Sequence, residues 1–204
     1  MLQYADFIKK ERLSDQFKVS QPLAGFTSWR IGGAAEWYTT PSSEDEIRQV
    51  LQFAECYQIP LTVLGGGSNV LISDHGLGGI VLHITHSYSG FKISKTGLVS
   101  AKAGTRLGAL IRKTMAQDLS GIEQLWGIPG TIGGAVTMNA GACNTEFFDH
   151  LVSVTSMTPT GEKRVRTKAE IIHGYRYSDY KYNGEVVYFT TTYSYLFKIG
   201  RPSR

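Results

Sequence analysis

Cysteine is scarce in this chain of 204 residues. The two cysteines, Cys56 and Cys143, are too few for a disulfide scaffold or a zinc cage. Cys56 falls in a helical pattern among apolar neighbours, which predicts a buried thiol. Cys143 follows a glycine-rich segment, where we expect it to fill space, although a position near a ligand stays open.

Long apolar runs are also missing, although 42% of the residues are hydrophobic and the chain is long enough to bury a core. No segment approaches the length of a membrane span. The N-terminus has charged residues at positions 9–12 and lacks the apolar stretch of a signal peptide. We therefore expect a cytoplasmic protein without membrane insertion.

Charge is not concentrated, and metal-ligand spacing is absent. The net charge of +4 comes from dispersed Lys and Arg, which gather only modestly at residues 198–204. Without a basic stripe and interleaved aromatics, a nucleic-acid partner is not expected, and the mild positive field favours small anionic ligands. We interpret His83, His86 and His173 as structural or exposed residues, and no metal site is predicted.

Glycine, in contrast, is abundant and unevenly placed, because 16 of the 23 glycines lie between residues 65 and 141. The first cluster follows an apolar strand pattern and has neither the G-x-x-x-x-G-K-[ST] nor the G-x-G-x-x-G spacing. The residues after it, 70–72, read as another strand. Three consecutive glycines, which have no Cβ to block the backbone N–H groups, predict a loop that binds a phosphate. A tight turn between buried strands is the alternative. The predicted cofactor-binding residues here are Leu64, Gly65, Gly66, Gly67, Ser68, Asn69 and Val70.

A second small-residue cluster runs from Gly127 to Ala142. Two separated clusters indicate a backbone surface shaped to an extended ligand with phosphates and planar rings, such as a dinucleotide. Asn139 is predicted either to orient the ligand or to tie down its own loop. The cofactor-binding residues predicted in this cluster are Gly127, Ile128, Pro129, Gly130, Thr131, Gly133, Gly134, Asn139 and Gly141.

These motifs, with Tyr175-Arg176-Tyr177-Ser178 after them, closely resemble the UDP-N-acetylenolpyruvoylglucosamine reductase family of bacterial peptidoglycan synthesis, over about residues 27–198. The resemblance implies non-covalently bound FAD, NADPH as the electron donor and enolpyruvyl UDP-N-acetylglucosamine as the substrate. It also implies an α+β fold, the FAD-binding domain of the vanillyl-alcohol-oxidase or PCMH type. That fold combines a small βαβ lobe with a larger, mainly antiparallel lobe that carries helices.

Local patterns supply the expected elements of both lobes. We expect a strand within 30–39, a helix that starts with a capping box at Ser43 and Glu46, and a strand at 61–64. Later strands are expected at 80–84, 98–103, 151–157 and 186–197, the last as an exposed edge. Thr105 is expected to cap a helix with Leu107, Leu110, Ile111 and Met115 on its apolar face, and Thr160-Gly161 to form a hairpin turn. The expected organisation is an N-terminal segment at 1–19, a first lobe at 20–85, a second lobe at 86–198 and a tail at 199–204.

Arg176 is the predicted catalytic residue, because it matches the family arginine that stabilises the enolate. Its planar, permanently charged fork suits both oxygens of a carboxylate. Without the family, an arginine between two tyrosines more often forms a surface ion pair. Tyr175 and Arg176 are predicted to bind the substrate, and Ser178 to fix the local turn.

The sequence departs from the family at its end. Family members continue into a third, substrate-binding domain with a serine that protonates the enolate and a later glutamate, and neither motif occurs here. We therefore expect a chain that binds FAD and turns over poorly by itself. A non-catalytic FAD-binding fragment and another oxidoreductase of the same superfamily are the alternatives, and the oligomeric state stays open.

Overall fold

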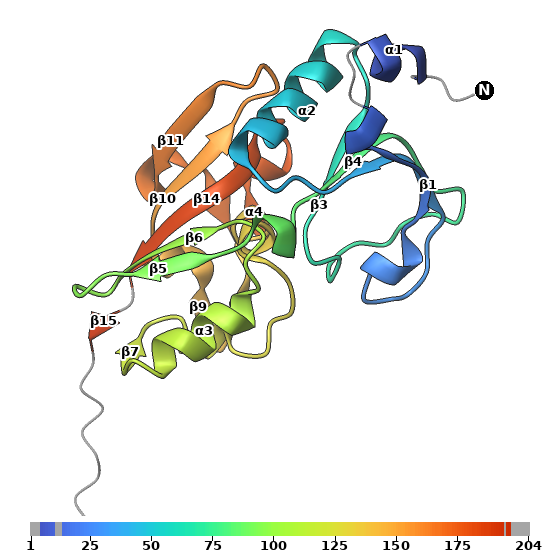
Figure 1. Cartoon of the computed structure of the whole chain (residues 1–204). Coiled ribbons are helices and arrows are strands. Elements are labelled where there is room, and N and C mark those ends of the chain that lie inside the picture. The colour runs from blue at the N-terminus through green and yellow to red at the C-terminus, as the bar shows by residue number, and fades with distance from the viewer. Residues whose placement is uncertain (1–4, 11–13, 194, 197–204) are drawn as a thin grey trace, which may run out of the picture.

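The structure is a computed structural model that describes residues 5–10, 14–193 and 195–196. The expected tail at 199–204 and the end of the strand expected at 186–197 lie outside these residues. The chain forms two main sheets, one on each side of Figure 1, with helices between and beside them. The boundary expected at 85/86 stays a prediction.

The smaller sheet is mixed and has the strand order β1-β2-β4-β3. β1 runs antiparallel to β2, whereas β2 and β3 both pair in parallel with β4. The expected βαβ unit is therefore present, with β4 inserted between its two strands. The elements are α1 (Ala5–Lys10), β1 (Lys18–Pro22), β2 (Ala34–Thr39), α2 (Glu44–Cys56), β3 (Leu61–Leu64) and β4 (Leu77–His83).

The larger sheet is antiparallel throughout and has the order β11-β10-β14-β6-β5. Three short two-stranded pairs, β7 with β15, β8 with β9 and β12 with β13, accompany it. The elements are β5 (Phe91–Ile93), β6 (Leu98–Lys102), α3 (Leu107–Met115), β7 (Leu119–Ser120), α4 (Ile132–Thr137), β8 (Gly141–Ala142), β9 (Thr145–Glu146), β10 (Leu151–Met157), β11 (Lys163–Thr167), β12 (His173–Gly174), β13 (Tyr177–Ser178), β14 (Val186–Tyr193) and β15 (Tyr195–Leu196).

Helix α2 begins where the sequence predicts. Ser43 is its N-cap, and the hydroxyl accepts a hydrogen bond from the Glu46 N–H at 3.1 Å. The Glu46 carboxylate accepts from the Ser42 N–H at 2.7 Å, one residue earlier than in a standard capping box. The apolar face of α2 packs into a core cluster that includes Trp37 of the smaller sheet and Tyr188 of the larger one. This helix therefore joins the two sheets through a shared core.

Several expectations are wrong because these features depend on tertiary contacts, which local sequence patterns do not reveal. β14 is paired on both sides, with β10 and β6, so it is a central strand and not an exposed edge. Residues 70–72 form no strand. Thr105 does not cap α3, and the N-cap is Arg106 instead. The Thr105 hydroxyl accepts a hydrogen bond from the Gly90 N–H and donates one to the Gly90 carbonyl. Cys56 is exposed, and Met115 is half exposed at 50%.

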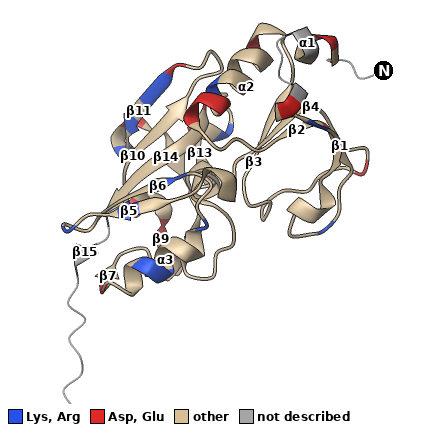
Figure 2. Ribbon diagram, viewed as in Figure 1, with Lys and Arg blue, Asp and Glu red and all other residues tan. Residues whose placement is uncertain are grey.

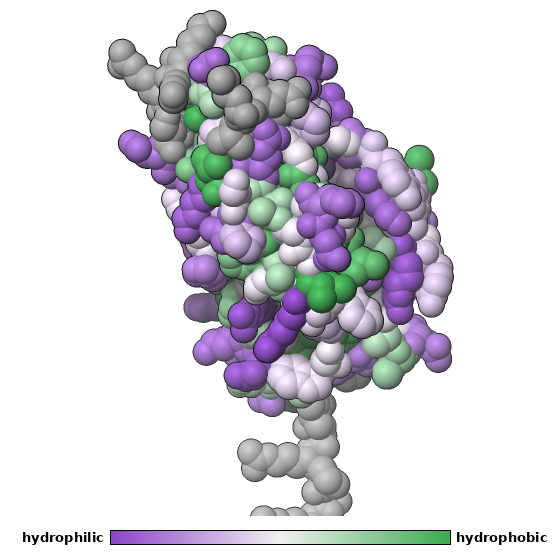
Figure 3. Space-filling view, turned by 90° about the vertical axis from the view of Figure 1, so that its right-hand side faces the viewer, coloured by the Kyte–Doolittle hydropathy of each residue, from purple (hydrophilic) through white to green (hydrophobic). Residues whose placement is uncertain are grey.

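Charged and apolar side chains are spread over the surface. Figure 2 shows Lys and Arg on several separate elements, among them β11, whose sequence includes Lys163, Arg164 and Arg166. On β11, Arg164 pairs with Glu185 at 2.9 Å and Arg166 pairs with Asp179 at 2.5 Å. Figure 3 shows green apolar patches among polar residues on the side of the smaller sheet. In the part of the chain that the structure describes, no helix has the length and apolar character needed to cross a membrane.

Candidate functional site

A cavity of about 1130 Å³ is lined by α2, β3, α4 and β14 together with both glycine-rich segments. We call residues 65–69 the glycine loop and residues 127–131 the second loop. Most of the predicted cofactor-binding residues lie at this cavity, although they come from segments about sixty residues apart. The predicted residues in its lining are Leu64, Gly65, Gly66, Gly67, Ser68, Asn69, Val70, Ile128, Pro129, Gly130, Thr131, Gly133, Gly134, Gly141 and Arg176.

The two loops touch each other directly. A Cβ at Gly66 would lie 2.8 Å from Gly130 Cα, and one at Gly65 would lie 2.7 Å from Thr131 Oγ1. Ser68 Oγ also donates a hydrogen bond to the Pro129 carbonyl at 3.1 Å. Some of these glycines are thus needed for loop-to-loop contact, in addition to any approach of a phosphate.

Thr131 supplies a buried polar atom without a partner. The residue is 5% exposed, and its hydroxyl oxygen makes no hydrogen bond within the described structure. Thr131 directly precedes α4, a short helix that contains two glycines although glycine disfavours helix. A buried hydroxyl normally has a partner, so this one is suited to a ligand in the cavity.

Three of the predicted residues lie outside the lining. Gly127 is exposed, and Tyr175 is 80% exposed. Asn139 is fully buried, where its amide donates to Glu146 at 2.6 Å and to the Gly174 carbonyl at 3.0 Å. These contacts match the alternative in which Asn139 ties down its own loop.

Arg176 lies in a short hairpin, residues 173–178, which we call the Arg176 hairpin. Its guanidinium donates to the Gly141 carbonyl at 2.6 Å and lies 4.9 Å from the centre of the Tyr175 ring. The backbone of Arg176 has φ +56, in the left-handed region that non-glycine residues rarely adopt. Such strain is often found at functional sites, where the surrounding structure holds it.

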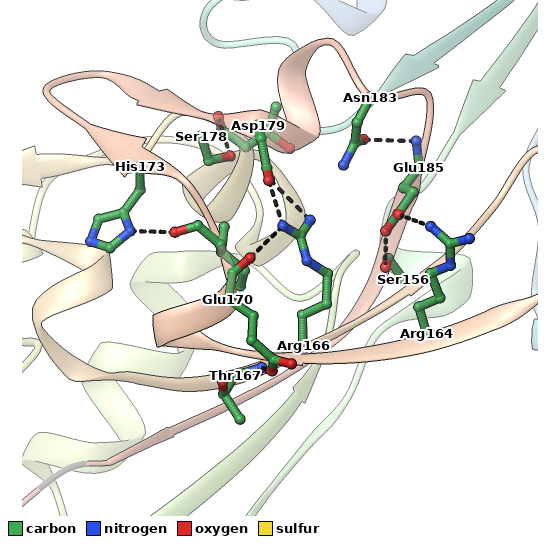
Figure 4. A network of polar contacts seen from close by, with 12 residues as sticks. Ser156, Arg164, Arg166, Thr167, Glu170, His173, Ser178, Asp179, Asn183 and Glu185 are labelled. Carbon is green, nitrogen blue, oxygen red and sulfur yellow. Dashed lines mark hydrogen bonds and ion pairs between the residues drawn. The ribbon is translucent and has the colours of Figure 1, made fainter.

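The Arg176 hairpin is held at its C-terminal end. Ser178 Oγ donates to the Thr137 carbonyl at 2.9 Å, which supports its predicted role in fixing the turn. Figure 4 shows Arg166 of β11 pointing at Asp179, with contacts of 3.1 and 2.5 Å, and at the Glu170 carbonyl. Such two-point pairing fixes geometry as well as charge. The hairpin is therefore anchored to the larger sheet directly after its second strand.

His83 also contacts the glycine loop of the site. It is buried at the end of β4, and its Nε2 lies 2.9 Å from the Gly65 carbonyl oxygen. Its pKa is lowered mainly by burial, which disfavours the imidazolium, and the nearby His86 adds to this effect. Burial likewise lowers the pKa of His150.

Because the pKa values of these two histidines are lowered, we expect the free energy of unfolding to fall in mild acid. Below pH 6.5 the unfolded chain binds protons at His83 and His150 that the folded chain does not, so the free energy of unfolding decreases as pH falls. The slope is at most about 1.4 kcal/mol per pH unit for each histidine. Urea unfolding at pH 7.5 and 5.5 measures the loss, which should be smaller in His83→Gln. An equal loss in both proteins would contradict the assignment to His83.

Sequence reasoning missed several lining residues, among them Ala103, Lys181 and Val187. Lys181 lies five residues after Arg176, so the Tyr-Arg-Tyr-Ser motif could have drawn attention to it. Val187 and Ala103 are ordinary strand-associated residues whose side of the sheet depends on the tertiary fold. Among the described residues, His, Cys, Asp and Glu side chains form no group able to hold a metal ion.

A family model described as an FAD binding domain matches residues 35–166, and the chain belongs to this family. The two sheets agree with it, because the fold is the mixed α+β FAD-binding domain of the PCMH type, with a small mixed sheet and a larger antiparallel one. Alkyldihydroxyacetonephosphate synthase, at 18% identity and a TM-score of 0.64, covers 95% of this chain and 41% of its own chain, and shares the fold alone.

More specifically, the chain is a homologue of UDP-N-acetylenolpyruvoylglucosamine reductase. It is 42% identical to the Gloeobacter violaceus enzyme over 166 residues, which are 81% of this chain and 56% of that protein. A Synechococcus enzyme is 42% identical over 82% of this chain and 53% of its own length. The structure of the Thermus caldophilus reductase superposes with a TM-score of 0.75 at 31% identity, covering 87% of this chain and 62% of that one. The chain spans about half the length of the curated relatives it matches.

Proposed function

We propose that this chain forms the FAD-binding part of an NADPH-dependent UDP-N-acetylenolpyruvoylglucosamine reductase that acts in the cytoplasm in peptidoglycan precursor synthesis. The observation that carries the proposal is one cavity lined by both glycine-rich loops and by Arg176. Its volume of about 1130 Å³ is above the roughly 300–1,000 Å³ typical of small-molecule sites, as a dinucleotide requires.

The residues of the cavity fit a non-covalently bound dinucleotide. Backbone N–H groups of the glycine loop, with the side-chain amide of Asn69, would hold the pyrophosphate, while the Ser68 hydroxyl donates to the Pro129 carbonyl of the second loop. The small residues of the second loop would face the flavin ring, and the buried Thr131 hydroxyl would gain a partner. FAD, when bound, supplies hydride transfer, which side chains cannot perform.

Arg176 would act on the substrate. Addition of hydride to the enolpyruvyl double bond places negative charge on the carboxylate-bearing fragment, and the guanidinium would stabilise this enolate. Because the guanidinium already bonds to the Gly141 carbonyl, it is held in place before the substrate arrives. We propose that the proton comes from the half of the reductase that lies beyond the matched region in the relatives, where the family resemblance places a serine.

A second candidate is an FAD-binding chain without turnover of its own. It is favoured by the coverage of the relatives, because the chain matches only about half of their length. In that case the cavity still binds FAD, whereas any docking surface or acid contributed by the other half of the relatives lies outside the matched residues. Loss of general acid catalysis alone costs about 10² to 10⁴-fold in rate.

The test separates the two candidates. The purified chain, loaded with FAD under anaerobic conditions, should lose its visible flavin absorbance when NADPH is added. Subsequent addition of enolpyruvyl UDP-N-acetylglucosamine should restore the absorbance only at a trace rate. A well-folded chain that takes up no FAD would contradict the proposal, whereas FAD uptake without reduction by NADPH would favour the second candidate.

A further inference from the structure

The glycine loop is held in place by hydrogen bonds from several directions. Ile84 N–H donates to the Leu64 carbonyl at 2.8 Å, just before the loop begins. Ser28 N–H donates to the Gly67 carbonyl at 2.9 Å, near the end of the loop. Between these points, the carbonyl of Gly65 is bonded by a side chain, the imidazole of His83.

The direction of the Gly65 carbonyl matters for ligand binding. In a trans peptide the C=O and the following N–H point in opposite directions, so the His83 contact also turns the Gly66 N–H away from the imidazole. Neither Gly65 nor Gly66 has a Cβ that would resist rotation of this peptide unit. A fixed partner for the carbonyl therefore restrains the Gly66 N–H to one orientation, in addition to the close approach of Gly66 to Gly130.

Tyr38 completes this arrangement. Its hydroxyl lies 2.6 Å from His83 Nδ1, on the opposite edge of the ring from Gly65. The carbonyl can only accept, so Nε2 carries the proton and Nδ1 accepts from the tyrosine. Burial raises the pKa of Tyr38 to about 12, which keeps its hydroxyl protonated as a donor. Both edges of a neutral imidazole are thereby satisfied.

Packing fixes the rings of this pair. Phe26 stacks on Tyr38 with centroids 5.3 Å apart and meets the His83 ring at 5.1 Å. The backbone of Phe26 also approaches the glycine loop closely, because a Cβ at Gly67 would lie 1.8 Å from the Phe26 carbonyl oxygen. The imidazole is thus held by aromatic contacts while it holds the loop.

We propose that Tyr38 and His83 are positioning residues that fix the Gly65–Gly66 peptide and so orient the Gly66 N–H toward a bound pyrophosphate. The inference rests on the proposed function, in which the glycine loop binds FAD. Neither Tyr38 nor His83 lines the cavity, so they would act through the backbone of Gly65. Preorganised donors bind an anion without the cost of ordering the loop at the moment of binding.

The test compares FAD affinity in matched variants of the full chain by fluorescence titration. His83→Leu removes the donor, and we expect binding about ten-fold weaker. Tyr38→Phe keeps the stacked ring and removes only the hydroxyl, with an expected loss of about three- to ten-fold. In His83→Gln the side-chain amide can donate to Gly65, so affinity should return to within about three-fold of wild type.

Tyr188→Phe is the matched control, because it also deletes a buried tyrosine hydroxyl, one that donates to Glu44 at 3.0 Å and lies outside the cavity lining. We expect it to leave FAD affinity unchanged while lowering the thermal midpoint about as much as Tyr38→Phe. If His83→Leu fails to fold by circular dichroism, the comparison of Tyr38→Phe with Tyr188→Phe decides. Unchanged affinity in both Tyr38→Phe and His83→Leu would overturn this inference alone, whereas a wild-type chain that binds no FAD would overturn the proposed function together with it.

Discussion

Replacing Gly66 by valine is expected to weaken FAD binding by at least about a hundred-fold. The atoms nearest to an added Cβ are backbone atoms of the second loop, namely Gly130 Cα at 2.8 Å, Gly130 C at 3.3 Å and Thr131 N at 3.4 Å. Backbone cannot rotate aside as a flexible side chain can, so the branched valine must push the two loops apart. Such a shift moves the cofactor-binding groups of the two loops out of the positions that contact FAD, so binding is weakened.

The matched control is Gly108→Val in α3. A Cβ at Gly108 meets no atom within 4 Å, and valine forms helix better than glycine does. FAD fluorescence titration of both variants, with circular dichroism to confirm the fold, measures the effect. Wild-type FAD affinity in Gly66→Val, alongside a normal Gly108→Val, would show that the contact between the two loops is not needed for binding.

Arg176→Ala is expected to abolish most of the turnover while FAD stays bound. The experiment needs the chain joined to the second half of a relative such as the Gloeobacter violaceus reductase, which is 42% identical to it over the matched region. Loss of a donor that stabilises an oxyanion costs about 10² to 10³-fold in rate. Arg176→Lys keeps the charge but loses the planar fork, so it should restore little of the activity.

Arg112→Ala is the control for this substitution. Arg112 also lies over an aromatic ring, that of Trp126 at 5.8 Å, but it is exposed on α3 and outside the cavity lining. Its loss should leave both turnover and FAD content unchanged. The rates are measured as steady-state oxidation of NADPH in the presence of the enolpyruvyl nucleotide sugar. Full turnover in Arg176→Ala would contradict a catalytic role for Arg176.

Local signals in the sequence predict much of this fold. The start of α2 at Ser43, the strand β3 before the glycines and the turn at Thr160-Gly161 all depend on neighbouring residues. In the turn, the Gly161 N–H donates to the Thr158 carbonyl at 2.9 Å, and Gly161 has φ +84. These features appear where expected because capping and turn geometry are decided within a few residues.

Other features depend on contacts between distant segments. The order of the strands places β14 in the middle of its sheet, and nothing in its own sequence distinguishes a central from an edge strand. Helix α4 forms although Gly133 and Gly134 disfavour it, because tertiary contacts override weak propensity. Gly133 packs against Ala103, where an added Cβ would lie 3.0 Å from the alanine Cβ.

The candidate site likewise has some features that local sequence predicts and others that depend on contacts between distant segments. The sequence motifs predict part of the cavity lining, because the glycine clusters and Arg176 are visible directly, although Gly127, Asn139 and Tyr175 lie outside it. They do not predict that Gly66 faces Gly130, or that His83 holds the Gly65 carbonyl. Those contacts join segments that are distant in the chain or lie on neighbouring strands, so only the assembled sheets bring them together.

The most direct measurement is a crystal structure of this chain with FAD bound. We expect the pyrophosphate against the backbone N–H groups of the glycine loop, the flavin ring beside the second loop, and the Arg176 guanidinium at the cavity near the ring. We also expect a hydrogen bond to the Thr131 hydroxyl, which has no partner within the described structure. FAD bound outside this cavity, or with its pyrophosphate away from residues 65–69, would contradict the account.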